Sequence, residues 1–203
     1  TSFFHSAGAT EPLNIGIAFI HGTSDHRQDA EGGYWQRTFI NQVSAGLENK
    51  NNVFIVACDF SHYMWFEDAA GCTVDQLLKF VDENHIDKLV LYTHSNGANI
   101  VRWILSNPTF DPRFYKVSQI VYNVVAIAPS SGGTFLAEEV MNGTTFETAV
   151  SWLLGYRNNA IKQQREADMM SYNNTLLFGS LGRLNVQAPF RIIVGTDTAA
   201  SPV

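Results

Sequence analysis

Short, almost continuous apolar runs recur along this chain. They have the length and the β-branched and aromatic content of buried strands, and turn-forming residues bound them. These runs occupy residues 14–20, 53–57, 88–93, 120–128 and 190–194. Strands of a half-exposed sheet would alternate apolar and polar residues, and these runs do not. The pattern therefore indicates strands that are covered on both faces.

Helical patterns separate the runs. The clearest is residues 74–84, where Val74, Leu77, Leu78 and Val81 recur at the i, i+3, i+4, i+7 spacing of an amphipathic helix. Further helices are predicted over residues 34–47 and 96–105. Buried strands that alternate with helices favour a mostly parallel sheet with helices on both faces. The sequence thus predicts one α/β domain over residues 1–203.

A long insertion interrupts this alternation before the last apolar run. Residues 135–184 look helical, and part of the insertion has an apolar face opposite a polar one. The face consists of Phe146, Ala149, Val150, Leu153 and Leu154. Two interpretations stay open, since an insertion of this length commonly has a role of its own. The segment is either plain cover for the sheet or a helical cap or lid over a functional site.

Composition narrows the class of protein. The 203 residues are 45% hydrophobic and 16% charged, which is typical of a globular domain with a real core. The net charge of −6, without a Lys/Arg run, argues against nucleic acid as a partner. The sequence contains no apolar stretch of the roughly 18 residues that a transmembrane segment needs. The low charge and the many Asn, Ser and Thr residues favour a secreted or periplasmic protein.

The chain has two cysteines, Cys58 and Cys72. A disulfide between them closes a loop of about 15 residues and would stabilise the fold by about 3 kcal/mol. Two unrelated buried thiols are the alternative. The secreted-type composition favours the disulfide.

The strongest chemical signal is the run Thr93-His94-Ser95-Asn96-Gly97, between a predicted strand and a predicted helix. A serine hydroxyl is a poor nucleophile unless it is exposed, held and deprotonated by a base. A sharp strand-to-helix turn holds it, and the helix N-terminus behind it offers free N–H groups to developing negative charge. The usual pattern is G-x-S-x-G, and here Thr93 replaces the first glycine. The placement predicts Ser95 as a nucleophile.

This run resembles the nucleophile turn of bacterial lipases and esterases of the α/β-hydrolase superfamily. A second matching motif is Ile20-His21-Gly22-Thr23, after the first apolar run. The resemblance implies an α/β-hydrolase fold and an oxyanion hole formed by the backbone N–H groups of Thr23 and Asn96. It also implies cofactor-free hydrolysis of a small-molecule or lipid ester through an acyl-enzyme.

In such enzymes the acid follows the nucleophile in the chain and the histidine comes last. Asp197, just after the fifth apolar run, is the expected acid, and Asp59 is the runner-up. All six histidines precede Asp197, and the residues after it contain no base. We therefore expect the catalytic histidine to lie outside residues 1–203, on a missing part of the fold or on a second polypeptide. His26 and His62 follow strand ends and would serve only in an unusual chain order.

Other functions remain open at this point. A catalytically inactive α/β-hydrolase fold that binds a ligand or a protein would explain the absent histidine. Amidase, thioesterase and acyltransferase activities use the same machinery and are not separated by sequence. A metal site from His21, His26 and either Asp25 or Asp29 has suitable ligand types, but it lacks a recognised ligand spacing.

Overall fold

The computed structural model describes residues 11–131, 158–174 and 190–193. Two of the predicted features lie outside the described residues. One is Asp197, the expected acid, and the other is the apolar face between Phe146 and Leu154. Both therefore stay predictions.

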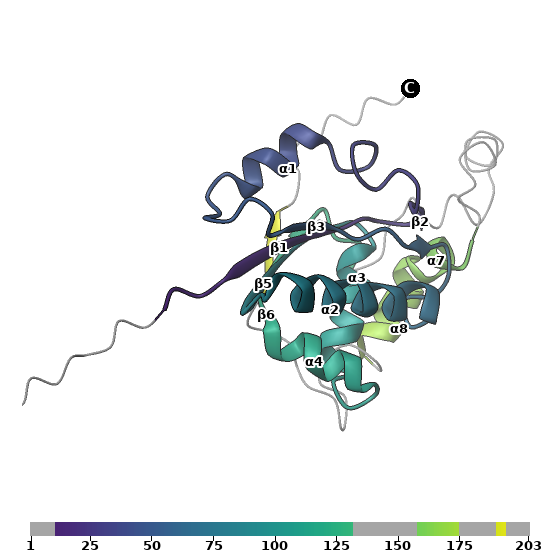
Figure 1. The fold of residues 1–203 in the computed structure, drawn as a ribbon. Coiled ribbons are helices and arrows are strands. Elements are labelled where there is room, and N and C mark those ends of the chain that lie inside the picture. The colour runs from purple at the N-terminus through teal and green to yellow at the C-terminus, as the bar shows by residue number, and fades with distance from the viewer. Residues whose placement is uncertain (1–10, 132–157, 175–189, 194–203) are drawn as a thin grey trace, which may run out of the picture.

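The core of the structure is a five-stranded parallel sheet in the order β3-β1-β5-β6-β7 (Figure 1). The strands are β1 (Ile15–Ile20), β3 (Val53–Ile55), β5 (Lys88–His94), β6 (Val121–Ile127) and β7 (Phe190–Ile193). Parallel strands end at a common edge, and here Ile20 pairs with Thr93 while His94 pairs with Ile127. This register gathers the segments that follow β1, β5 and β6 at one edge of the sheet. The predicted α/β fold class is confirmed.

Helices cover both faces of the sheet (Figure 1). On one face lies α1 (Arg37–Ser44), and on the other lie α2 (Cys72–Asn84), α3 (Gly97–Ser106) and α4 (Pro112–Ile120). Strand β1 is apolar throughout because it is buried from both sides. Phe19 packs with Trp35 and Ile40 under α1, while the neighbouring Ile20 belongs to the larger cluster with the other helices.

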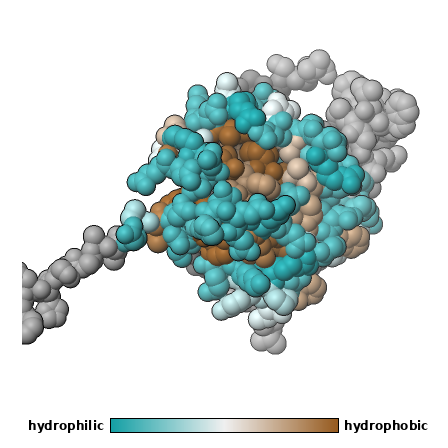
Figure 2. All heavy atoms as spheres, in the orientation of Figure 1, coloured by the Kyte–Doolittle hydropathy of each residue, from teal (hydrophilic) through white to brown (hydrophobic). Residues whose placement is uncertain are grey.

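One edge of the described sheet, at β3, is incompletely covered. Figure 2 shows apolar side chains between α1 and α2, where β3 forms the edge of the described sheet. Val53, Phe54 and Ile55 of this strand are only partly buried. Within the described residues, no helix is long and apolar enough to span a bilayer.

Three elements were not predicted from sequence. A two-stranded antiparallel sheet joins β2 (Ser24–Asp25) to β4 (Asp59–Phe60), and a π-helical turn, η1 (Glu67–Gly71), precedes α2. The third is α4, which ends where β6 begins. Its start has a clear local cause, because the Asp111 side chain accepts a hydrogen bond from the Arg113 N–H and a proline occupies the first turn.

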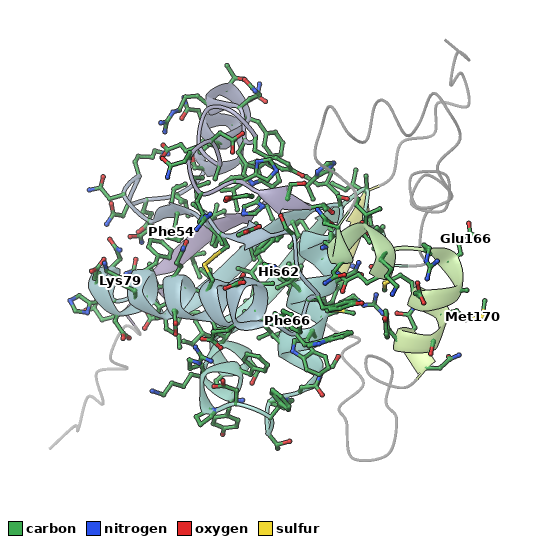
Figure 3. The ribbon with its side chains drawn as sticks, turned by 90° about the vertical axis from the view of Figure 1, so that its right-hand side faces the viewer. Phe54, His62, Phe66, Lys79, Glu166 and Met170 are labelled. Carbon is green, nitrogen blue, oxygen red and sulfur yellow. A yellow bond between two sulfur atoms is a disulfide. The ribbon has the colours of Figure 1, made fainter. Side chains whose placement is uncertain are left out.

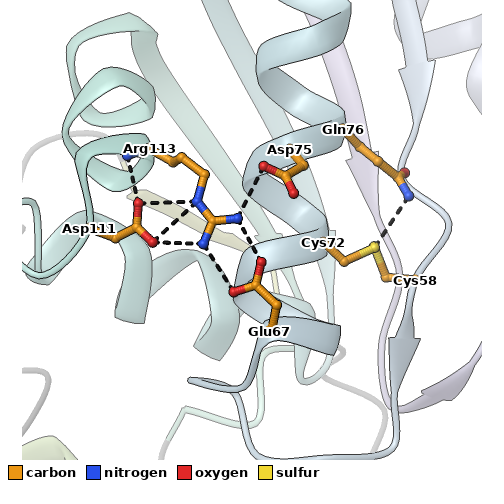
Figure 4. A network of polar contacts seen from close by, with 7 residues as sticks. All are labelled: Cys58, Glu67, Cys72, Asp75, Gln76, Asp111 and Arg113. Atoms are coloured by element: carbon orange, nitrogen blue, oxygen red, sulfur yellow. Dashed lines mark hydrogen bonds and ion pairs between the residues drawn. A yellow bond between two sulfur atoms is a disulfide. The ribbon is translucent and has the colours of Figure 1, made fainter.

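The predicted disulfide is present. Cys58 and Cys72 are bonded, 14 positions apart, and join the segment after β3 to the first residue of α2. Nearby, Arg113 of α4 forms hydrogen bonds and ion pairs with Glu67 and Asp75, as well as with Asp111 (Figure 4). This guanidinium lowers the pKa of Glu67 and Asp111 and ties α4 to η1 and α2.

The described part of the insertion contains α7 (Asn159–Gln163) and α8 (Glu166–Tyr172). Met169 of α8 is fully buried in the main core, whereas Met170 is exposed. Figure 3 shows Glu166 and Met170 on α8, at the opposite end of the molecule from Lys79. This part of the insertion is therefore helical, and Met169 packs it against the main core. Its role as a lid is untested.

Candidate active site

Ser95 lies in the turn between β5 and α3 and has a left-handed backbone, with φ of 52°. This conformation is uncommon for a residue with a side chain and costs roughly 1–3 kcal/mol. The sheet stabilises this strained conformation, because the Ser95 N–H donates to the carbonyl of Ile127, the last residue of β6, at 3.1 Å. Ser24 and Ala128, in the segments after β1 and β6, also have positive φ values. Backbone strain thus gathers at the edge where the predicted site lies.

Two glycines join this turn to the segment after β1. A Cβ atom built on Gly22 would lie 3.1 Å from the Cβ of Ser95. A Cβ atom on Gly97 would lie 2.5 Å from the carbonyl oxygen of His21 and 2.8 Å from that of Ile20. Both contacts are too close for a larger residue. The two sequence motifs, H-G-T and S-x-G, are therefore packed directly against each other.

The peptide unit that carries the Thr23 N–H is fixed from several sides. His21 is fully buried, and its Nδ1 lies 2.8 Å from the carbonyl oxygen of Gly22, in the same peptide unit. The Nε2 atom of His21 accepts from the Cys58 N–H at 3.1 Å, so Nδ1 carries the proton and donates. The trans peptide is planar, so its N–H points opposite to the held carbonyl. Among the described residues, this N–H has no acceptor.

Asn96 follows the nucleophile and is equally constrained. Its carbonyl accepts from the N–H groups of Asn99 and Ile100, and its side-chain oxygen accepts from Asn99 Nδ2 and Gln163 Nε2, each at 3.1 Å. The backbone N–H of Asn96 has no acceptor within the described residues. The buried Asn96 Nδ2 also has no hydrogen-bond partner among the described residues. Thr23 and Asn96 thus each keep one backbone N–H available. This is the condition that an oxyanion hole requires.

His94 and Tyr34 form a second link between the two motifs. The Gly22 N–H donates to the Tyr34 hydroxyl at 2.8 Å, and this hydroxyl contacts His94 Nδ1. The Tyr34 hydroxyl therefore bridges the Gly22 N–H and the Nδ1 atom of His94. Burial lowers the pKa of His94, and it lowers the pKa of His21 to about 4. Both rings are therefore neutral supports of the turn at pH 7.

None of the described histidines is hydrogen-bonded to Ser95. His26 faces Asp29 and the Thr23 carbonyl with its two ring nitrogens, at 2.8 and 3.0 Å. His62 pairs with Asp68 and stacks on Phe66 at the surface (Figure 3). His85 caps the C-terminus of α2 in a left-handed conformation.

Asp59 was the alternative acid, and the residues around His21 were candidate metal ligands. Asp59 pairs with Asp25 across the small β2–β4 sheet and accepts from the Ser61 N–H. In the described residues, no three His, Cys, Asp or Glu side chains are arranged to hold a metal ion. His21 in particular uses both ring nitrogens within the fold.

Sequence reasoning missed the polar side chains that support the site from further along the chain. Gln164 Nε2 donates to Thr23 Oγ1 at 2.7 Å, and Asn99 Nδ2 donates to Ser130 Oγ at 3.1 Å. Arg102, with a pKa lowered to about 10 by burial, donates to Asn173 Oδ1 at 2.7 Å. These residues form no motif, because their partners are distant in sequence.

The fold is similar to that of lipase BlEst2 from Bacillus licheniformis in its mature form. The TM-score is 0.57 at 16% sequence identity, over 83% of this chain and 61% of that chain. The propeptide form of that lipase gives a TM-score of 0.56 at 16% identity, over 82% of this chain and 33% of that chain. Phospholipase PlaB from Legionella pneumophila gives 0.53 at 15% identity, over 79% and 34%. No protein-family model and no curated protein sequence matches this chain.

These similarities establish the fold of the chain as that of α/β-hydrolases. At 15–16% identity they carry no residue roles. This chain also spans less than two thirds of the length of the structures it matches. The function therefore has to be argued from the site.

Proposed function

We propose that this protein is a serine-dependent carboxylic ester hydrolase, lipase-like, with Ser95 as the nucleophile. The observation that carries the proposal is the left-handed Ser95 packed against Gly22. The residues that follow these two in the chain, Asn96 and Thr23, each have a backbone N–H without an acceptor among the described residues. A strained serine on a strand-to-helix turn is the geometry that exposes a hydroxyl for attack. The similarity in fold to two enzymes named lipase and phospholipase agrees with this chemistry.

The reaction follows from these groups. Ser95 Oγ attacks the ester carbonyl carbon while its proton passes to a base, and the carbonyl oxygen becomes an oxyanion. The N–H groups of Thr23 and Asn96 bind this oxyanion, and the N-terminus of α3 adds its dipole. The C–O bond to the alcohol then breaks, and the base returns the proton to the leaving oxygen. Water attacks the acyl-enzyme in the same way, releasing the acid and restoring the serine hydroxyl. No cofactor takes part in these steps.

We propose that the base is a histidine from outside the described residues, oriented by Asp197. His94, next to Ser95 in sequence, is engaged by Tyr34 through its Nδ1, and none of the described histidines is hydrogen-bonded to Ser95. Asp197 would accept a hydrogen bond from the base and fix its tautomer. A native mass measurement before and after denaturation identifies any second polypeptide that supplies the histidine.

The proposed substrates are small-molecule or lipid esters, and the proposed location is secreted or periplasmic. The Cys58–Cys72 disulfide supports this location, since such bonds persist in oxidising compartments. The insertion over residues 135–184 would act as a cap or lid over the substrate.

A fluorophosphonate probe tests the nucleophile. We expect the full protein to gain the mass of one phosphonyl group and Ser95→Ala to gain none. Hydrolysis of p-nitrophenyl butyrate should fall by about 10⁶ in Ser95→Ala, as for loss of other triad serines. Ser118→Ala, on α4, is the matched control and should label like the wild type. Equal labelling of Ser95→Ala would refute the assignment. A folded wild type that does not label at all would favour a binding protein instead.

A further inference from the structure

Two adjacent glutamines in the insertion reach the two residues that are proposed to bind the oxyanion. Gln163 is the last residue of α7, and Gln164 follows it. Gln163 Nε2 donates to Asn96 Oδ1 at 3.1 Å, and Gln164 Nε2 donates to Thr23 Oγ1 at 2.7 Å. Their sequence separations from these partners are 67 and 141 residues. One turn of the insertion therefore contacts both sides of the proposed hole.

Both glutamine side chains have a defined orientation. The oxygen of Gln163 accepts from the Met64 N–H at 3.0 Å, which directs its nitrogen toward Asn96. The nitrogen of Gln164 also donates to the Ala160 carbonyl at 2.8 Å, within its own turn. Gln163 is fully buried and Gln164 is 3% exposed. Side chains held by two hydrogen bonds in a buried site are rigid enough to keep the residues that they contact in fixed positions.

The cost of burying these residues argues against a purely structural role. Ordering a glutamine side chain costs up to about 2 kcal/mol, and burying its amide costs more unless every bond is made. Leucine would fill a similar space with a smaller ordering cost and without a buried amide. The hydrogen bonds also end on Thr23 and Asn96, two residues whose backbone N–H groups the proposed reaction needs.

We propose that Gln163 and Gln164 are positioning residues of the oxyanion hole. They act through the side chains of Asn96 and Thr23 and touch no reacting atom. The inference rests on the proposed function, because it needs an oxyanion at Ser95. Donors lower the barrier only where they are held in place before charge develops. Loss of either glutamine should therefore slow the chemical step and leave substrate binding almost unchanged.

The test uses Gln163→Met and Gln164→Met in the full chain, which keep the side-chain length and remove the hydrogen bonds. Gln119→Met, at an exposed position of α4, is the matched control. With p-nitrophenyl butyrate, we expect kcat to fall about tenfold to a hundredfold in each site variant, with KM within about twofold, since small misplacement of catalytic groups has effects of this size. The rate of phosphonylation of Ser95 should fall in parallel.

A double-mutant cycle separates positioning from general destabilisation. Thr23→Val removes the oxygen that Gln164 holds and changes the shape little. If Gln164 acts through this oxygen, Gln164→Met combined with Thr23→Val should be no slower than the worse single variant. Additive losses in kcat would overturn the inference. Gln164→Glu is a second variant for the case in which Gln164→Met does not fold. Its carboxylate can accept a hydrogen bond from the Thr23 hydroxyl, so KM should again stay unchanged while the added charge lowers kcat.

The outcomes distinguish the two proposals. A wild type that labels at Ser95, together with site variants that turn over at the wild-type rate, overturns the role of the glutamines alone. A rise in KM without a fall in kcat overturns it as well, because it would place the glutamines in substrate binding. A folded wild type that neither labels nor hydrolyses the ester overturns both proposals.

Discussion

Replacing Gly97 by alanine tests the packing of the nucleophile turn without assuming any activity. The added Cβ would meet two backbone oxygens, at 2.5 Å from His21 and 2.8 Å from Ile20, where ordinary contacts begin at 3.4 Å. Neither oxygen belongs to a flexible side chain, so α3 and the end of β1 must separate by roughly 0.5 Å or more. Such overpacking costs about 1–3 kcal/mol. Alanine is favoured over glycine in helices by at most about 1 kcal/mol. The clash outweighs this gain, so the substitution should lower the free energy of unfolding.

The assay is thermal or urea-induced unfolding of the wild type, Gly97→Ala and Gly46→Ala. Gly46 is the matched control because a Cβ atom there would meet nothing within 4 Å. We expect Gly97→Ala to lose about 2 kcal/mol, which corresponds to a decrease of about 4–8 °C in Tm for a chain of this size. Gly46→Ala should stay within about 0.5 kcal/mol of the wild type. If Gly97→Ala unfolds at the wild-type midpoint, the two motifs are not packed as described.

Three further predictions address the disulfide, a buried histidine and the expected acid. Replacing Cys58 and Cys72 together by serine should lower the free energy of unfolding by about 3 kcal/mol in denaturant titrations, and an unchanged midpoint would contradict this. The pKa of His21 is about 4 in the fold and 6.5 in its ordinary state, so between these values the unfolded chain binds the proton that the folded chain excludes. Stability should therefore fall by about 3 kcal/mol as the pH falls from 6.5 to 4, and His21→Gln should flatten this dependence; equal slopes in both proteins would argue against it. Asp197→Asn should leave Tm unchanged and lower kcat by about 10⁴, whereas an effect of that size in Asp59→Asn alone would make Asp59, on β4, the acid.

The fold was readable from sequence because its central strands, β1 and β5, are covered by helices on both faces. Runs such as residues 88–93 are apolar for that reason, and the structure has a strand there. Helix bounds were less accurate. The predicted helix over residues 34–47 is shorter, Arg37–Ser44, because the chain before it bends back, with Glu31 bridged to Trp35. The start of α4 at Asp111 and Pro112 had a capping signal that apolar periodicity alone does not reveal.

The sequence indicated candidate site residues only where they are close together in the chain. Ser95 and Gly97 form one short motif whose geometry depends on a single turn, and Gly22 belongs to a second motif of the same kind. The supporting residues Gln163 and Gln164 have partners in other segments. No periodicity or spacing connects a position in the insertion with the end of β1, because tertiary packing alone brings them together. Sequence therefore predicted the atoms that would react, and the structure was needed to find what holds them.

The disulfide and the proposed oxyanion hole belong to one chain of contacts. The bond fixes Cys58 against α2, and the Cys58 N–H donates to the Nε2 atom of His21. That hydrogen bond requires a neutral ring with its proton on Nδ1, and the Nδ1 proton is donated to the Gly22 carbonyl. Since a peptide unit is planar, the carbonyl direction sets the direction of the Thr23 N–H. A buried histidine that protonates would lose its acceptor nitrogen and release Cys58. Burial lowers the pKa of His21 far enough to keep this contact intact at neutral pH, so the burial that stabilises the core also maintains the geometry on which the proposed chemistry depends.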